Sequence, residues 1–188
     1  MKKKEEEIID KKKEYNVWAE IWDYLKTIVL VVAAVFLLNQ FVLINARIPS
    51  ESMQNTIMVG DQIFGNRLAY MNSDPERFDI VIFRYPDDPE QFFIKRIIGL
   101  PGDTVEIKDG KVYINGSETP LDDSFCPEVP VGDYGPYEVP EESYFMLGDN
   151  RNWSKDSRFW NNTYVHKDAI LGKAVLRYWP LNKIGVVK

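Results

Sequence analysis

An uncharged run of 18 residues, 27–44 (TIVLVVAAVFLLNQFVLI), restricts the possible folds of this chain more than any other feature. Eighteen mostly apolar residues approach the length of a helix that crosses the hydrocarbon core of a bilayer. A buried core helix is the weaker alternative, because a domain formed by the rest of the 188 residues could hardly surround an apolar helix of that length. We therefore expect residues 27–44 to form a transmembrane anchor, with the lipid bilayer as a partner.

The charges around this run predict its orientation. Residues 1–26 hold seven lysines, balanced by seven acidic residues, whereas Arg47 is the only basic residue in the twenty that follow the run. Lysine and arginine accumulate on the cytoplasmic side of membrane spans, so residues 1–26 should be a cytoplasmic charged segment and residues 45–188 should lie outside. A cleaved signal peptide is less consistent with the sequence, because the preceding segment is long and acidic and residues 44–46 (INA) lack a small-x-small cleavage pattern.

Composition excludes several classes of function. The net charge of -6 argues against a nucleic-acid surface, which needs basic residues to neutralise phosphates. One cysteine, Cys126, and one histidine, His166, cannot form an internal disulfide or fill a structural zinc site of four Cys or His ligands. We expect no nucleic acid partner, no internal disulfide and no structural zinc site of this kind.

Beyond the anchor, apolar residues recur at every second position in several segments, which predicts a mostly β domain over residues 45–188. Asp109-Gly110 between two alternating segments is a strong signal for a hairpin. Residues 118–140 carry five prolines and should form a surface loop or a poorly ordered excursion. A folded-over sheet or an open barrel is the expected architecture. The predicted strands are residues 78–83, 92–98, 105–108, 111–114, 144–147 and 170–178.

Ser52 is the strongest candidate for a nucleophile. It lies in the segment 48–53 (IPSESM), which begins four residues after the apolar run and also contains Ser50. A serine hydroxyl needs an adjacent base to take its proton. His166 has only the neighbouring Asp168 to support a Ser-His-Asp triad, so a triad lacks any further pattern.

Lys95 is the alternative base. In the predicted strand, alternation places Phe93, Lys95 and Ile97 on one apolar face. Desolvation disfavours the ammonium ion and lowers the pKa of a lysine toward the range in which it acts as a general base. A lysine at a strand edge with a solvated amine fits the same pattern, so the residues alone leave both interpretations open.

Four stretches of residues 48–158 form a recognisable set. They are residues 49–53 (PSESM), Arg77 with 79–83 (DIVIF), 94–103 (IKRIIGLPGD), and 148–151 (GDNR) with Ser154 and 156–158 (DSR). Together they resemble bacterial type I signal peptidase, a family of membrane-bound Ser-Lys proteases that remove signal peptides. The single span and the short insertion resemble the compact Gram-positive form, and lysine at position 95 resembles the bacterial rather than the endoplasmic-reticulum form.

The resemblance implies roles for individual residues. Ser52 would be the nucleophile, Lys95 the general base, and Ser154 the residue that orients the lysine amine. Ser50 would join the Ser52 backbone amide as an oxyanion donor. Structural ion pairs near the site would be formed by Arg96, Asp149, Asp156 and Arg158. Shallow pockets for the small residues one and three positions before the cut would be lined by Ile48, Ile57, Phe93 and Ile94.

The resemblance also implies a substrate and a location: exported preproteins with small residues before the cleavage site, cut outside the bacterial plasma membrane without metal or cofactor. The sequence departs from the family pattern at three positions. Asn55 stands where a proline is common, Asn152 replaces an aspartate, and Trp153 adds an indole. A non-catalytic, membrane-anchored β binding module and a self-cleaving Ser-Lys protease of the repressor type are the alternative functions.

Overall fold

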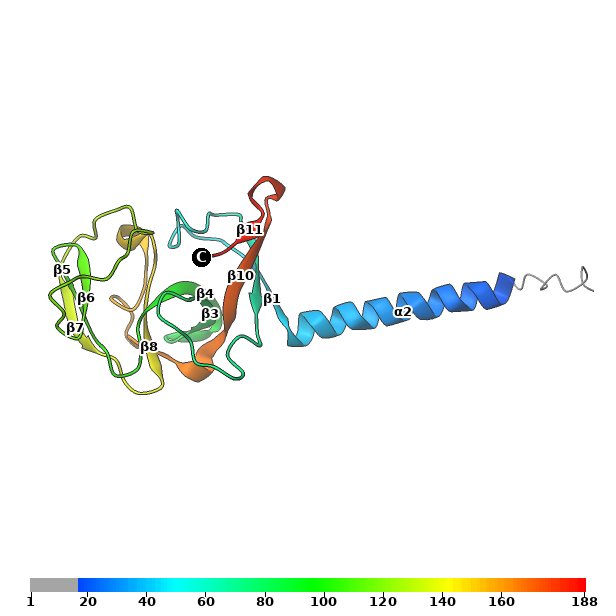
Figure 1. Cartoon of the computed structure of the whole chain (residues 1–188), viewed down its shortest axis with the longest axis horizontal. Helices are drawn as coiled ribbons and strands as arrows, with labels where there is room; N and C mark the ends of the chain where they lie inside the picture. The colour runs from blue at the N-terminus through cyan, green and yellow to red at the C-terminus, as the bar shows by residue number, and fades with distance from the viewer. Residues whose placement is uncertain (1–16) are drawn as a thin grey trace, which may run out of the picture. The chain divides into compact units, whose positions relative to one another are not determined.

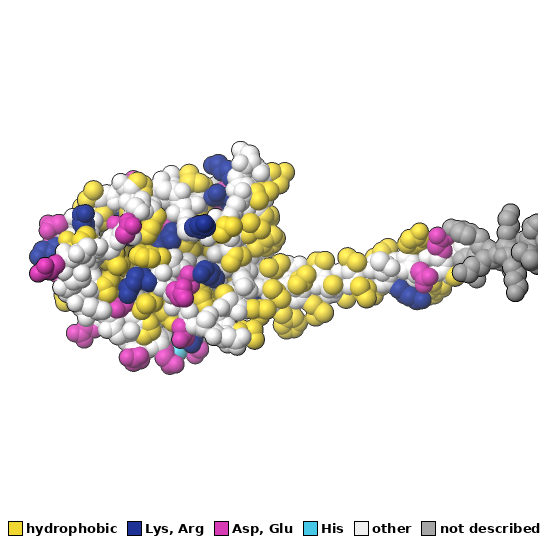
Figure 2. Space-filling view, in the orientation of Figure 1, with side chains coloured by type: hydrophobic (Ala, Val, Ile, Leu, Met, Phe, Trp, Pro, Cys, Tyr) yellow, Lys and Arg dark blue, Asp and Glu magenta, His cyan; other side chains and the backbone are white. Residues whose placement is uncertain are grey.

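The computed structural model describes residues 17–188, and the chain divides into two units, Met1–Gln40 and Phe41–Lys188 (Figure 1). The described part of the first unit lies in the helix α2 (Val17–Phe41), which is long and apolar enough to cross a membrane. None of the residues 17–41 is buried. Figure 2 shows hydrophobic side chains along this helix and charged ones near its N-terminal end.

The helix α2 differs from the expected anchor, residues 27–44, at both ends. The helix begins ten residues earlier and so includes the charged residues Glu20, Asp23 and Lys26, of which Lys26 pairs with Asp23 at 3.2 Å. It ends three residues earlier because the end of the apolar run changes to strand, where Ile44 is buried in the core of the second unit. An uncharged run contains no signal for such a change, since both elements there are apolar.

The second unit consists of two antiparallel sheets, which confirms the predicted mostly β fold (Figure 1). The larger has eight strands in the order β1 (Leu43–Arg47), β2 (Gln62–Asn66), β10 (Ile170–Trp179), β3 (Ile80–Tyr85), β4 (Asp88–Gly99), β8 (Ser143–Leu147) and β9 (Val165–His166), with β11 (Gly185–Val186) paired to β10. The smaller has the order β6 (Lys111–Ile114), β5 (Thr104–Lys108) and β7 (Tyr134–Glu138). Three short 3₁₀ turns complete the described structure: η1 (Arg151–Trp153), η2 (Lys167–Ala169) and η3 (Leu181–Lys183).

The strand β4 connects the parts of the core. Its alternating side chains reach different apolar clusters: Ile94 packs against one, Ile97 belongs to a second, and Ile98 belongs to a third. Side chains on opposite faces of a strand are expected to do this. The strand is therefore held on both faces, which fixes the position of any residue it carries. The three clusters contain, in turn, Met53, Phe83 and Phe145.

The predicted strands at 92–98, 105–108, 111–114, 144–147 and 170–178 are confirmed, and the strand expected at 78–83 begins two residues later. Asp109 and Gly110 both adopt positive φ, of 50° and 71°, as the hairpin signal requires. The loop predicted at 118–140 is wrong in part, because β7 lies within it. Among the strands of residues 17–188, β7 pairs only with β5, and it contains a proline, which sheets tolerate at an edge.

Candidate active site

Ser52 lies on the loop 48–61 between β1 and β2. Backbone bonds close the base of this loop, from the Ile48 amide to the Asp61 carbonyl at 3.0 Å and from the Gly60 amide to the Ile48 carbonyl at 2.9 Å. Met53, the residue after the serine, is fully buried and anchors the loop in the core. The serine is itself 7% exposed and thus held between this anchor and β4.

Lys95 comes from the middle of β4, and its Nζ lies 2.6 Å from the Ser52 Oγ. The amine also donates to the Ile94 carbonyl oxygen at 3.0 Å, and the residue is 3% exposed. Burial lowers the pKa of Lys95 to about 8, although the Asp156 and Asp149 carboxylates act in the opposite direction. A neutral amine of this kind can accept the proton of the hydroxyl beside it.

The two other serines of the predicted site occupy different surroundings. The Ser50 Oγ lies 3.5 Å from the Ser52 Oγ and is exposed, at the open side of the nucleophile. The Ser154 hydroxyl is buried but has no hydrogen-bond partner in the described structure. The bond expected from Ser154 to the lysine amine is therefore absent from residues 17–188 as described, and the amine donates to a backbone carbonyl instead.

Gly148 is a residue of the site that sequence reasoning did not single out for a role. A Cβ there would lie 2.2 Å from the Ser154 Oγ and 2.4 Å from the Ser52 carbonyl oxygen. Only glycine lets the turn 148–154 approach the Ser52 loop so closely. The only sign of this role in the sequence is that Gly148 belongs to the GDNR stretch, one of the four that carry the family resemblance.

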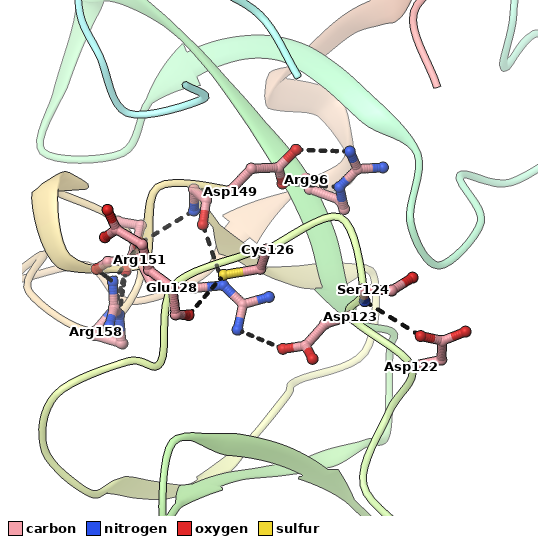
Figure 3. Close-up of polar contacts among 11 residues, drawn as sticks. Arg96, Asp122, Asp123, Ser124, Cys126, Glu128, Asp149, Arg151 and Arg158 are labelled. Carbon is pink, nitrogen blue, oxygen red and sulfur yellow. Dashed lines mark hydrogen bonds and ion pairs between the residues drawn. The ribbon is translucent and has the colours of Figure 1, made fainter. Parts of the chain in front are cut away.

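Two buried ion pairs support this turn, and both were predicted to lie beside the site. Arg96 donates two bonds to Asp149, at 2.8 Å and 2.7 Å (Figure 3). Arg158 donates to both oxygens of Asp156, at 2.8 Å and 2.9 Å. Thr56 from the Ser52 loop also donates to Asp149, so one carboxylate joins β4 to the loop. Bidentate arginine–carboxylate pairs fix geometry as well as charge.

A cavity of about 300 Å³ opens beside the nucleophile. Phe93 and Ile94 line it, whereas Ile48 and Ile57, the other two residues expected in the substrate pockets, are not among its lining residues. Both isoleucines pack in the core cluster around Met53, 3% and 0% exposed, because the loop turns its apolar side chains inward. The complete lining is Pro49, Ser50, Ser52, Phe92, Phe93, Ile94, Lys95, Trp153 and Lys155.

His166 does not take part in this arrangement. Its side chain is 53% exposed and lies 3.8 Å from Glu142 and 3.5 Å from Asp168. Among the contacts described for residues 17–188, none joins it to Ser52. The same residues contain no group of three His, Cys, Asp or Glu side chains that could hold a metal ion.

Comparisons with known proteins identify the family of this chain. The model of the family "Signal peptidase, peptidase S26" matches residues 21–179. A probable signal peptidase I-2 of Synechocystis is 40% identical over 92% of this chain and 78% of its own length, and signal peptidase I P of Bacillus subtilis subsp. natto is 33% identical over 92% and 96%. A crystal structure of a signal peptidase I from Enterococcus faecalis V583 aligns with a TM-score of 0.46 and 37% identity, over 54% of this chain and 97% of that one. The chain belongs to the signal peptidase family and is a type I signal peptidase, a serine protease that removes signal peptides from preproteins.

Proposed function

We propose that this protein cleaves exported preproteins with Ser52 as the nucleophile and Lys95 as the general base. The observation that carries the proposal is the 2.6 Å separation of a buried lysine amine from a serine hydroxyl. Serine becomes a useful nucleophile only beside a base, and lysine becomes a base near neutral pH only when its charged form is disfavoured. The burial of Lys95 beside the Ser52 hydroxyl supports both conditions.

The reaction follows from this pair. Neutral Lys95 takes the Ser52 proton as the Oγ attacks the carbonyl carbon of the scissile bond. The resulting ammonium gives the proton to the leaving amine, which leaves an acyl-enzyme on Ser52. Lys95, neutral again, activates a water that hydrolyses the ester. The Ser50 hydroxyl and the Ser52 backbone amide would donate to the oxyanion in both halves of the reaction.

The substrate would carry small residues one and three positions before the cut. Phe93 and Ile94 support this, since they form an apolar part of the cavity that contains the Ser52 hydroxyl. The helix α2 would anchor the enzyme in the plasma membrane, with the N-terminus in the cytoplasm and the β domain outside. The preprotein is then cut on the side to which it is exported.

The test is cleavage of a model preprotein by the purified full chain in detergent, followed by the masses of the products. A single cut after a small residue is expected, and Ser52→Ala and Lys95→Ala should each abolish it. Ser73→Ala is a matched control, because Ser73 is exposed and its hydroxyl donates only to the Ala69 carbonyl. Cleavage only of the enzyme itself would favour a self-cleaving protease, and no cleavage by a folded enzyme would favour a binding module.

A further inference from the structure

A segment between β6 and β7, residues 121–131, lies against the turn 148–154, and we call it the strap. The strap belongs to the region in which the sequence predicted only a proline-rich loop. In Figure 3 its ribbon carries Asp123, Cys126 and Glu128 toward Arg151. Three side chains connect the strap to the turn and to β4: Asn152 of the turn, and Asp123 and Phe125 of the strap.

Asn152, in the turn, binds the strap in both directions. Its Oδ1 accepts from the Val131 amide at 2.9 Å, and its Nδ2 donates to the Val129 carbonyl at 3.1 Å and to the Glu128 carboxylate at 3.4 Å. The side-chain amide makes this possible, because it carries an acceptor oxygen and two N–H donors. An aspartate at position 152 could still accept from the Val131 amide, but it could not donate to the Val129 carbonyl or to the Glu128 carboxylate. Its second carboxylate oxygen would instead face these two oxygen atoms and be repelled by them.

Two arginines beneath the strap make the other contacts. Arg151 is 1% exposed and donates to Asp123 at 3.0 Å. The Phe125 ring stacks on the guanidinium of Arg96, whose Cζ lies 4.1 Å from the centroid of the ring. Arg96 holds Asp149, as described above, so the ring covers the buried ion pair that joins β4 to the Ser52 loop.

The turn 148–154 also binds the backbone of the nucleophile directly. The Asn150 amide donates to the Ser52 carbonyl at 3.1 Å, and the Asn150 side chain donates to the Glu51 carbonyl, also at 3.1 Å. Two residues along the chain, Asn152 is fixed by the strap. The path from strap to nucleophile therefore has only three steps: the Asn152 side chain, the backbone of the turn, and the Asn150 bonds.

We propose that the strap holds the Ser52 backbone in its working position through the turn 148–154, with Asn152 as the positioning residue that joins the two. The proposal rests on the proposed function, since it concerns turnover only if Ser52 is the nucleophile. It also accounts for a departure from the family pattern, because the strap backbone requires an amide where an aspartate is common. Misplacement of reacting groups by ~1 Å costs about 10²-fold in rate.

The test is Asn152→Asp in the full chain, with kcat and KM measured on a preprotein and thermal unfolding measured alongside. We expect kcat to fall about tenfold or more, because the transition state depends on the position of Ser52 more than binding does. KM should stay within about twofold of the native value, since none of the cavity contacts is removed. Asn72→Asp is the matched control: Asn72 is exposed and makes no side-chain hydrogen bond in the described structure, so both constants should be unchanged.

Glu128→Gln supplies a rescue. Its amide can donate to the carboxylate introduced by Asn152→Asp, so the double variant should recover much of the lost kcat. If Asn152→Asp fails to fold, Asn152→Ala removes the same bonds without repulsion and should lower kcat in the same way. A kcat within about twofold of native in a folded variant overturns the proposal, as does a double variant no faster than Asn152→Asp.

Hydrogen exchange at the Asn150 amide gives a readout that does not depend on turnover, and it can be repeated in a Ser52→Ala background. We expect faster exchange in Asn152→Asp than in the native chain. Unchanged exchange, or faster exchange with native kcat, overturns the positioning role. Cleavage by Ser52→Ala alone would instead overturn the proposed function, and the exchange rates would still decide whether the strap holds the turn.

Discussion

Lys95 can accept a proton only as a neutral amine, and its burial determines the pH at which that form is populated. Desolvation lowers the pKa from 10.5 to about 8, against the effect of the two nearby carboxylates. Below this pH the amine is mostly protonated, so kcat/KM for preprotein cleavage should rise with pH through an apparent pKa near 8. A profile that rises only near pH 10 would contradict the role of a buried base.

Charge and basicity can be separated at the same residue. Lys95→Arg keeps a positive charge that cannot be removed, and Lys95→Met keeps the length without the charge. Both should fold and both should lack activity. Lys167→Arg is the control, since that lysine lies on the surface beside Asp74.

Roles for single residues could be predicted from the sequence, but their packing could not. Ser52 and Lys95 became candidates because their motifs occur in a fixed order. Whether Ile57 faces the cavity or the core depends on how the loop 48–61 folds, and no local pattern determines that. The free hydroxyl of Ser154 is likewise a result of tertiary packing, which places Gly148 against it.

At the scale of elements, the loop 48–61 depends on a residue that the sequence marked as unusual. Asn55 has a φ of 85°, a value that asparagine tolerates and that proline, fixed near -65°, cannot adopt. The next residue, Thr56, then donates to Asp149. The loop of this protein therefore takes a path that the common proline excludes.

Asn55→Pro should destabilise the chain by more than about 1 kcal/mol, because the native φ is incompatible with proline. Asn55→Gly should be close to native, since glycine adopts positive φ readily. Thermal unfolding of the full-length variants measures both, with cleavage rates as a second measurement. Equal stability of the proline and glycine variants would show that the loop does not need this conformation.

The sequence predicted those elements whose local pattern is typical of a single kind of structure. The twelve-residue β4 alternates apolar faces, and the hairpin between β5 and β6 has its own turn signal. The strand β1 was hidden because its start continues the apolar run of the helix, and β7 because it lies among prolines. Both are sheet strands whose pairing partners are distant in sequence, so only tertiary structure reveals them.

At the scale of the whole molecule, the helix bounds change the account of the anchor. The uncharged part of α2 is 15 residues long, residues 27–41, or about 22 Å, whereas a hydrocarbon core is about 30 Å thick. A helical span of that thickness would therefore include the preceding turns, where Trp18, Trp22 and Tyr24 lie. Aromatic residues of this kind are enriched at membrane interfaces, which suits the N-terminal end of the helix.

The orientation of this anchor can be tested by labelling with a membrane-impermeant maleimide in a Cys126→Ser background. Ile8→Cys and Asn72→Cys place one thiol on each side of α2 without changing the net charge, and Asn72 is exposed in the β domain. Because the seven lysines precede the span, we expect the thiol of Asn72→Cys to be labelled in intact cells. The thiol of Ile8→Cys should react only after the membrane is permeabilised. The opposite pattern would place the β domain in the cytoplasm, where exported preproteins have not yet crossed the membrane, and would contradict the proposed site of cleavage.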